Sequence, residues 1–346
     1  MTIQSQEYFA RQITIPDFGT KGLGKLRSST VAIAGVGGVG SAAAYYLSKS
    51  GVGNLRLIDQ DIVEATNMHR LHATEMEDLY KPKAEVLTKS LSRLHPWCRI
   101  EPVVETITGK NVGQLLEGAD LVLDGLDNFR TRYVVNRFSS RTRTPYLFVS
   151  AVSDQAHIAL FNPPDTPCLE CVMPGIHDRP EDSCEVLGIT PTITGLVGAT
   201  AANMAVRHLL RLSTEPATKL LTIDMNGPTF LLTKISERAD CSACNGSSKI
   251  APEAHEIVTL LCGERTANVL PPFEIDLDLH KISQRIPKED ILIITNSVVV
   301  FRKDAFTVSL FQNGRTLISG VEGEEEALEM AREIWEEVLG KELMLS

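Results

Sequence analysis

The stretch that decides the fold runs from residue 31 to residue 70 and reads VAIAGVGGVGSAAAYYLSKSGVGNLRLIDQDIVEATNMHR. Its short, uninterrupted apolar start predicts a buried strand, and the run GSAAAYYLSKS predicts a helix that ends at Gly51. The run NLRLID predicts a second buried strand. Strand, glycine-rich turn, helix and strand in this order form a βαβ unit.

Strand and helix patterns continue to alternate after this unit, as far as PYLFVSAV. This alternation favours a Rossmann-like α/β fold, in which a doubly wound parallel sheet has helices on both faces. Beyond it, the patterns AHIALFN, LLTIDMN and TFLLTKIS predict strands without regular crossover helices. We therefore expect a mixed sheet that is first parallel and then antiparallel.

The last third of the chain has a different character. Residues 245–254 combine small and polar residues with a proline, which is typical of a linker. Several strand patterns follow, among them ILIITNSVVVFR, and Asn313-Gly314 is a strong hairpin-turn signal. An amphipathic helix is expected near the C-terminal end. We predict a first domain at residues 1–248 and a small α+β domain at residues 255–346.

The composition excludes several classes of protein. The 346 residues are 43% hydrophobic and 23% charged, as in an ordinary globular protein, and the formal net charge is −10. An acidic chain without a basic stripe is not expected to bind nucleic acid. No apolar run reaches the roughly 20 residues that span a bilayer, and the N-terminal residues lack the apolar core of a signal peptide. We expect a cytoplasmic protein with no membrane partner.

The glycine-rich turn predicts a nucleotide site. Its glycines Gly35, Gly37, Gly38 and Gly40 follow a strand and open a helix, where backbone amides can approach phosphates. Asp59 ends the next strand, where it can accept hydrogen bonds from ribose hydroxyls. By itself this pattern fits any nucleotide, including NAD.

Three charged residues further along the chain favour a nucleotide that is consumed. Arg70, Lys83 and Asp127 each follow a predicted strand, and strand ends at one edge of a doubly wound sheet converge on the ligand. Hydride transfer does not need such a group, whereas attack on an α-phosphate needs cations or Mg²⁺ to offset the charge on its oxygens. Taken singly, Arg70 and Lys83 are equally compatible with ordinary surface charges.

Several motifs together resemble one family. They are YFARQITIPDFG, AGVGGVG, DQDIVEATNMHR, KPKAEV, DGLDNFRTRYVVN, CLEC, TGLVGATAANMAVRHLL and CSAC. Residues 8–244 resemble the MoeB/ThiF/HesA family of adenylyltransferases, relatives of the catalytic core of ubiquitin-activating enzymes. The resemblance implies MgATP-dependent adenylation of the C-terminal glycine carboxylate of a ubiquitin-like sulfur-carrier protein ending in Gly-Gly, with release of pyrophosphate.

The resemblance also assigns roles to residues. It implies that Asp59 holds the ribose, that Arg70 and Lys83 hold the phosphates, and that Asp127 lies beside the α-phosphate and Mg²⁺. The remaining members of the implied ATP-binding set are Asp61, Asn67 and Asn128. Arg11 would reach the ATP of a neighbouring subunit, which implies a homodimer, although an ordinary exposed helix residue fits Arg11 equally well.

The cysteines predict a metal site. Cys168 and Cys171 form one CxxC pair, and Cys241 and Cys244 form another. Two such pairs can give four thiolates to a tetrahedral zinc that clamps distant segments together. A redox disulfide is the alternative.

Cys184 lies in a polar segment just before the long helical run of the first domain. Relatives often have a cysteine in the equivalent loop, and in some it forms a thioester or acyl-disulfide with the carrier. A catalytic role and a bystander thiol are equally compatible with its sequence context. The C-terminal domain could likewise dock the carrier, complete the dimer or only stabilise the protein.

Three other functions stay open from sequence alone. One is adenylation of a different carboxylate, such as one on a tRNA or a peptide. Another is an NAD-dependent oxidoreductase, because the glycine-rich turn fits both nucleotides. The third is a catalytically silent scaffold that has kept the fold.

Overall fold

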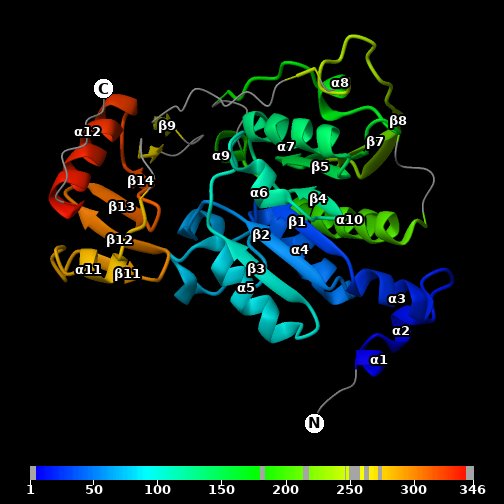
Figure 1. Cartoon of the computed structure of the whole chain (residues 1–346), viewed down its shortest axis with the longest axis horizontal. Helices are drawn as coiled ribbons and strands as arrows, with labels where there is room; N and C mark the ends of the chain where they lie inside the picture. Colours follow the sequence, from blue (N-terminus) through cyan, green and yellow to red (C-terminus); the bar gives the residue numbers. More distant parts are fainter. Residues whose placement is uncertain are drawn as a thin grey trace.

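The computed structural model describes residues 5–179, 184–212, 218–245, 247–248, 258–260, 265–271 and 275–339. Its strands form two separate sheets, one of eight strands and one of six. Figure 1 shows the larger sheet with its helices in blue to green and the smaller sheet in yellow to orange beside it. We call the described residues from 258 to 339 the C-terminal module.

The larger sheet is parallel in its first half and antiparallel in its second, as predicted. Its strands are β1 Thr30–Ala34, β2 Asn54–Ile58, β3 Arg99–Val103, β4 Leu121–Asp124, β5 Tyr146–Val152, β6 Gln155–Phe161, β7 Lys219–Asp224 and β8 Thr229–Lys234. Their order is β3-β2-β1-β4-β5-β6-β7-β8. The first five pair in parallel, and β6, β7 and β8 each pair antiparallel with the preceding strand. The mixed, doubly wound sheet is therefore confirmed.

Helices cover both faces of this sheet because alternate strand residues point to opposite sides. Val31 and Ile33 pack on one face with α3 Gly19–Arg27, α4 Gly38–Ser50, α5 Lys83–Leu94 and α10 Pro191–Leu210. Ala32 and Ala34 pack on the other face with α6 Val112–Leu116 and α7 Phe129–Thr142. The short elements are α1 Ser5–Tyr8, α2 Ala10–Ile13, η1 Ala65–Asn67, η2 Met76–Asp78, α8 Leu169–Val172 and α9 Cys184–Leu187. Among the helices of the described residues, none combines the length and apolarity that a membrane span requires.

The C-terminal module is an antiparallel sheet covered by helices. Its elements are β9 Val258–Leu260, β10 Thr266–Val269, α11 Leu279–Ser283, β11 Ile291–Ile294, β12 Val298–Lys303, β13 Phe306–Phe311, β14 Thr316–Ser319, α12 Glu324–Ile334 and η4 Trp335–Leu339. The strand order is β11-β12-β13-β14-β10-β9. Ala327, Ala331 and Ile334 of α12 are fully buried against the sheet. The small α+β fold is thus confirmed, whereas the limits at residues 248 and 255 stay a prediction.

One strand pattern in this module divides into two strands. The segment ILIITNSVVVFR forms β11 and β12, which are joined by a tight turn at residues 295–297. The hydroxyl oxygen of Thr295 accepts hydrogen bonds from the backbone amides of Ser297 (3.2 Å) and Val298 (3.0 Å). A threonine that bonds its own backbone two or three residues on favours a turn, so the apolar run folds back on itself.

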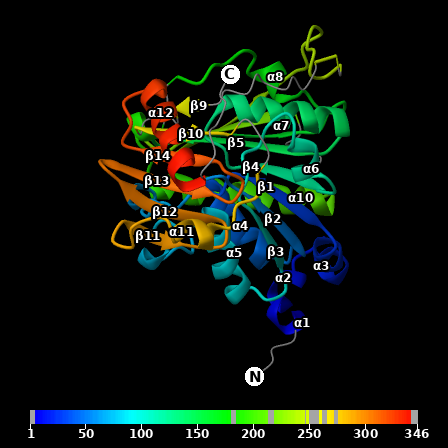
Figure 2. The same ribbon diagram turned by 60° about the vertical axis from the view of Figure 1, so that its left-hand side comes forward.

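The C-terminal module packs against the end of the larger sheet where β2 and β3 lie, and both views agree on this arrangement (Figures 1 and 2). Ile62, which follows β2, packs into an apolar cluster with Val298, Phe311 and Leu317 of the module. The hydroxyl of Ser297 also donates a hydrogen bond to Glu85 of α5. The two sheets therefore meet at a boundary with both apolar and polar contacts.

Candidate functional site

A cavity of about 610 Å³ opens where the carboxyl ends of the parallel strands meet. Its wall includes Gly35 after β1, Asp59 after β2, Asp127 after β4 and Val149 within β5. In the sheet, β2 and β3 lie on one side of β1, and β4 and β5 lie on its other side. The order in which the chain adds strands therefore reverses next to β1. This is the switch point at which open α/β sheets bind ligands.

The glycine-rich turn lies against the backbone that follows β4. Gly35 has φ +84°, and a Cβ atom there would lie 2.6 Å from the carbonyl oxygen of Gly125. A Cβ atom on Gly40 would lie 2.0 Å from the carbonyl oxygen of Gly35. Gly35, Gly37 and Gly38 line the cavity, whereas Gly40 is not among its lining residues. Gly40 is therefore explained by close packing of the turn onto the helix.

The carboxylate of Asp59 is held in place by backbone amides of the glycine-rich turn and of its own segment. It accepts hydrogen bonds from the amide of Val36 (2.7 Å) and from the amide of Asp61 (2.8 Å). Burial raises the pKa of Asp59 to about 6, and the positive charge of Lys83 opposes this shift. The carboxylate that was predicted to hold the ribose thus lies in the cavity wall, next to the glycine-rich turn.

Both cations that were expected at the phosphates line the same cavity. The ammonium of Lys83 lies 3.1 Å from a carboxylate oxygen of Asp61. Burial lowers the pKa of Lys83, but the negative charges of Asp61 and Asp59 outweigh this effect, so the pKa is raised. Arg70 donates from its guanidinium to the carbonyl oxygen of Thr66 at 2.9 Å. Both side chains are in the wall with Asp59, so the structure brings the predicted cations together.

Asp127 and Asn128 stand at the N-terminus of α7. The side-chain oxygen of Asn128 caps this helix by accepting from the amide of Thr131 at 2.9 Å, and its amide nitrogen donates to Asp127 at 3.0 Å. Below them, the buried Arg132 donates to Asp124 at 3.2 Å and to the carbonyl oxygen of Val149 at 3.0 Å. A capped helix and a buried ion pair thus fix the segment that carries Asp127 into the cavity.

Asp178 is a cavity residue that sequence reasoning missed. Its carboxylate accepts hydrogen bonds from the backbone amides of Phe129 (2.5 Å) and Arg130 (3.0 Å) in the first turn of α7. It comes from the exposed segment before residue 180, far along the chain from α7. No local pattern marks such a long-range contact, so the sequence carried no signal for it.

Two predicted residues lie outside the cavity wall, and the side chain of a third is not described. Arg11 is exposed on α2 and is not among the lining residues of the cavity. Asn67 is buried in η1 and is also absent from the lining, and among the described residues its side-chain oxygen has no hydrogen-bond partner. Cys184 begins α9, but its side chain lies outside the described part of the chain. Leu187, the last residue of α9, does line the cavity.

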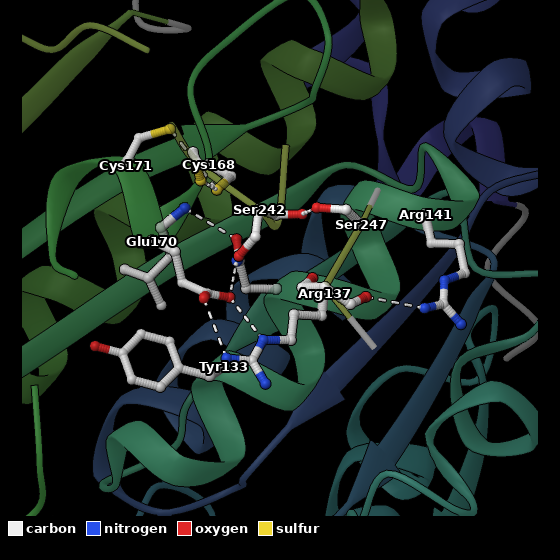
Figure 3. Close-up of polar contacts among 12 residues, drawn as sticks. Tyr133, Arg137, Arg141, Cys168, Glu170, Cys171, Ser242 and Ser247 are labelled. Carbon is white, nitrogen blue, oxygen red and sulfur yellow. Dashed lines mark hydrogen bonds and ion pairs between the residues drawn. The ribbon is translucent and has the colours of Figure 1, made fainter. Parts of the chain in front are cut away.

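The four cysteines of the two CxxC pairs form one cluster, in which Cys244 is partly buried and the others are buried. Figure 3 shows Cys168 and Cys171. The four sulfur atoms all lie within 4.8 Å of one another, and the individual separations are 4.0 Å for Cys168–Cys171, 3.7 Å for Cys168–Cys241 and 3.4 Å for Cys171–Cys244. A tetrahedral zinc with Zn–S bonds of about 2.3 Å needs S–S separations of about 3.8 Å. The donor set and its spacing therefore fit zinc.

The cluster is anchored to α7. Glu170, between the first two cysteines, accepts hydrogen bonds from the guanidinium of Arg137 at 2.9 and 3.1 Å and from Asn136 at 3.1 Å (Figure 3). The side-chain oxygen of Asn136 in turn accepts from the amide of Leu169 at 2.9 Å. These contacts tie the cysteine segment to the middle of the helix that begins just after Asp127.

Fold and cavity together define a doubly wound α/β protein with its cavity at the strand ends, where proteins of this fold bind ligands. The model of the ThiF family matches residues 9–244, and the chain belongs to this family. It is 34% identical over 245 residues to "Adenylyltransferase and sulfurtransferase MOCS3" of Drosophila yakuba, which covers 70% of this chain and 54% of the relative. It is 32% identical over 241 residues to "Sulfur carrier protein ThiS adenylyltransferase" of Escherichia coli, covering 69% of this chain and 95% of the relative.

Solved structures show the same fold. A crystal structure of E. coli MccB with ATP superposes with a TM-score of 0.61 at 21% identity, covering 70% of this chain and 75% of that one. The family-model match and the two curated relatives confirm the predicted membership of the MoeB/ThiF/HesA adenylyltransferases. The chain spans about half the length of several curated relatives that it matches, including the MOCS3 protein of D. yakuba.

Proposed function

We propose that the chain uses ATP to adenylate the C-terminal glycine carboxylate of a ubiquitin-like sulfur-carrier protein that ends in Gly-Gly. The observation that carries this proposal is the shared cavity of Arg70, Lys83 and Asp127 beside the glycine-rich turn. Both relatives are named as adenylyltransferases, which supports the choice of reaction. The E. coli relative is named for a sulfur carrier protein, which supports the choice of substrate.

The chemistry requires positive charge more than it requires a base. The carrier carboxylate is ionised at neutral pH, so it can attack the α-phosphorus directly. One P–O bond forms, the bond between the α-phosphorus and the bridging oxygen breaks, and pyrophosphate leaves. Charge on the phosphate oxygens is offset by Arg70 and Lys83, which is the main contribution a protein makes to such a transfer.

ATP would be held by residues of three strand ends. Asp59 would accept from the ribose, with Asp61 keeping Lys83 in place, and the amides of the glycine-rich turn would approach the phosphates. Mg²⁺ would supply further neutralisation of the phosphates when bound, and Asp127, an exposed carboxylate in the cavity wall, is a donor of the type that Mg²⁺ prefers.

The carrier would dock at the free edge of the larger sheet. Edge strand β8 exposes Phe230, Leu231 and Leu232, each 56% accessible, and exposed apolar edges mark partner-binding surfaces. This edge is two strands away from β6, whose His157 lines the cavity. Two strand spacings are about 10 Å, which about three extended residues of a carrier tail can cross.

Two further features belong to the proposal. In a later step, the thiolate of Cys184 would attack the acyl-adenylate, form a thioester and release AMP; the cavity contact of Leu187 in the same helix supports this role. A zinc ion held by Cys168, Cys171, Cys241 and Cys244 would serve a structural purpose, because four sulfur ligands leave no open position.

The proposal also includes a homodimer. Arg11 is exposed and absent from the cavity wall of its own chain, as a residue that serves a neighbouring subunit would be. Closed symmetric dimers of this kind share two equivalent sites.

Exchange of labelled pyrophosphate into ATP tests the proposed reaction. We expect exchange only when a carrier ending in Gly-Gly is present, and none with the same carrier lacking its two terminal glycines. Exchange stimulated by a small carboxylate would instead support a different substrate. Absence of exchange together with tight NAD binding would contradict the proposal and favour an oxidoreductase.

A further inference from the structure

Arg315 of the C-terminal module is completely buried although it carries a charge. It lies at the end of the turn between β13 and β14, and its guanidinium packs 3.6 Å from the ring centre of Phe311. One terminal nitrogen donates to the side-chain oxygen of Asn268 at 3.2 Å, and the other donates to the backbone carbonyl of Gln60. A buried guanidinium is costly unless its donors are paired. Both terminal nitrogens of Arg315 are paired, so these contacts define its position, whereas its Nε has no hydrogen-bond partner among the described residues.

The residue that Arg315 reaches across the module boundary is Gln60, which stands between two cavity carboxylates. Gln60 directly follows Asp59 and precedes Asp61. Its side-chain oxygen accepts from the hydroxyl of Thr106 at 2.7 Å. The Asp59–Gln60–Asp61 segment is therefore held from the module on one side and from the end of β3 on the other.

The same turn makes a second contact with the cavity wall. The side-chain amide of Asn313 donates to Glu105 at 3.4 Å, and Glu105 lines the cavity. Asn268 and Leu270 of the module are themselves lining residues. The module thus contributes part of the wall and also supports the segments after β2 and β3.

The charge of Arg315 matches its surroundings. Burial lowers the pKa of Arg315 to about 10, against the effect of Asp61, Glu105 and Asp59, so the guanidinium stays protonated at neutral pH. All three of these carboxylates lie in the segments that follow β2 and β3 of the larger sheet. The module therefore places a positive charge behind the acidic side of the cavity.

We propose that Arg315 is a positioning residue for the nucleotide site, and that the C-terminal module contributes to ATP affinity and ribose selectivity through it. This inference rests on the proposed use of ATP. Arg315 fixes the carbonyl of Gln60 and so sets the directions of the two neighbouring carboxylates. Asp59 then meets the ribose hydroxyls in a fixed geometry, which is what allows a site to reject a sugar that lacks one of them.

Calorimetric titration of the full chain with ATP and with 2′-deoxy-ATP tests the inference. We expect the wild-type protein to prefer ATP by about tenfold, as one lost hydrogen bond to a charged group implies. In Arg315→Met, which keeps the packing on Phe311, the Kd for ATP should rise about tenfold and the preference should fall below threefold. Arg315→Lys, which keeps the charge, should recover part of the affinity for ATP and part of the preference for ATP over 2′-deoxy-ATP. A role in folding alone would leave the sugar preference unchanged.

The matched control is Arg265→Met, which removes an arginine of the same module from an exposed ion pair with Glu322. It should bind both nucleotides as the wild type does. If Arg315→Met does not fold, Asn313→Ala replaces it in the test, because this substitution loosens the same turn. We expect the preference of Asn313→Ala for ATP to be lower than that of the wild type by a factor of about two to three. A folded Arg315→Met, or otherwise Asn313→Ala, with unchanged affinity and preference would overturn the inference. A wild-type protein that binds no ATP would instead contradict the proposed function itself.

Discussion

The cavity lies at the N-terminal end of α7, the cysteine cluster is anchored to the middle of the same helix, and the two sites are built in opposite ways. In the cavity, Asp127 is exposed and the wall encloses about 610 Å³ of free space. In the cluster, Cys168, Cys171 and Cys241 are buried and the four sulfur atoms lie within 4.8 Å of one another. An open polar site can admit and convert a substrate, whereas a closed site can only hold chain segments together.

This difference separates activity from stability. Changes in the cavity should reduce turnover while leaving the fold intact, and changes in the cluster should reduce stability while leaving the remaining folded protein active. A residue that affected both equally would break the distinction.

The largest effect is expected for Lys83→Met. Losing the cation nearest to Asp61 should lower the rate of ATP–pyrophosphate exchange about 10³-fold, or about 4 kcal/mol in the barrier. The control is Lys81→Met, because Lys81 forms a similar ion pair with Asp78 at 3.0 Å but is not a lining residue. Exchange rates of the two variants within tenfold of each other would contradict the assignment.

Cys241→Ser should act on stability. Loss of one thiolate should release the zinc and lower the melting temperature by about 4 °C, as expected for about 3 kcal/mol in a chain of this size. Metal analysis and thermal unfolding check this, with Cys98→Ala as the control for removing a buried thiol outside the cluster. The structural zinc site would be ruled out if the wild-type protein lacked about one zinc per chain, or if Cys98→Ala lowered the melting temperature as much as Cys241→Ser.

A pH dependence of nucleoside binding should distinguish Asp59 from the other cavity residues. Because its pKa is raised to about 6, Asp59 is mostly ionised at pH 7 and mostly protonated at pH 5, where it loses its ability to accept from both ribose hydroxyls. The Kd of adenosine, which has no titrating phosphate, should therefore rise about tenfold between pH 7 and pH 5. Asp59→Asn should bind weakly and equally at both values; a pH-independent wild type would show that Asp59 does not hold the ribose.

The smallest effect is expected at the edge strand. Phe230→Ser should raise the KM for the carrier about fivefold, since one exposed apolar contact is worth about 1 kcal/mol at an interface. Adenosine binding should not change, because Phe230 is not in the cavity wall. Thr233→Ala on the same exposed strand serves as the control. An unchanged KM would place the carrier elsewhere.

Much of the cavity could be predicted because its residues follow strands in regular βα units. The run that ends at Asp59 and the run that ends before Asp127 each mark a strand end, and strand ends of a parallel sheet meet at one edge. The paired cysteines were equally readable, since their spacing alone places two sulfurs on one side of a metal.

The rest depends on contacts between distant segments. Arg315 meets Gln60, and Asp178 meets the first turn of α7, only after the chain has folded. Gly40 has the spacing of a phosphate-binding glycine, but its tight approach to Gly35 explains it without a ligand. At Thr295 the strand pattern also failed to predict the structure, because hydrogen bonds from the backbone to the Thr295 side chain favour a turn within the apolar run.

The most direct test of the central claim follows one oxygen atom. The carrier is prepared with ¹⁸O in its C-terminal carboxylate and incubated with ATP and the enzyme, and the released AMP is analysed by mass spectrometry. Attack of the carboxylate on the α-phosphorus predicts AMP that contains one ¹⁸O atom. Unlabelled AMP, or cleavage of ATP to ADP and phosphate, would contradict the account.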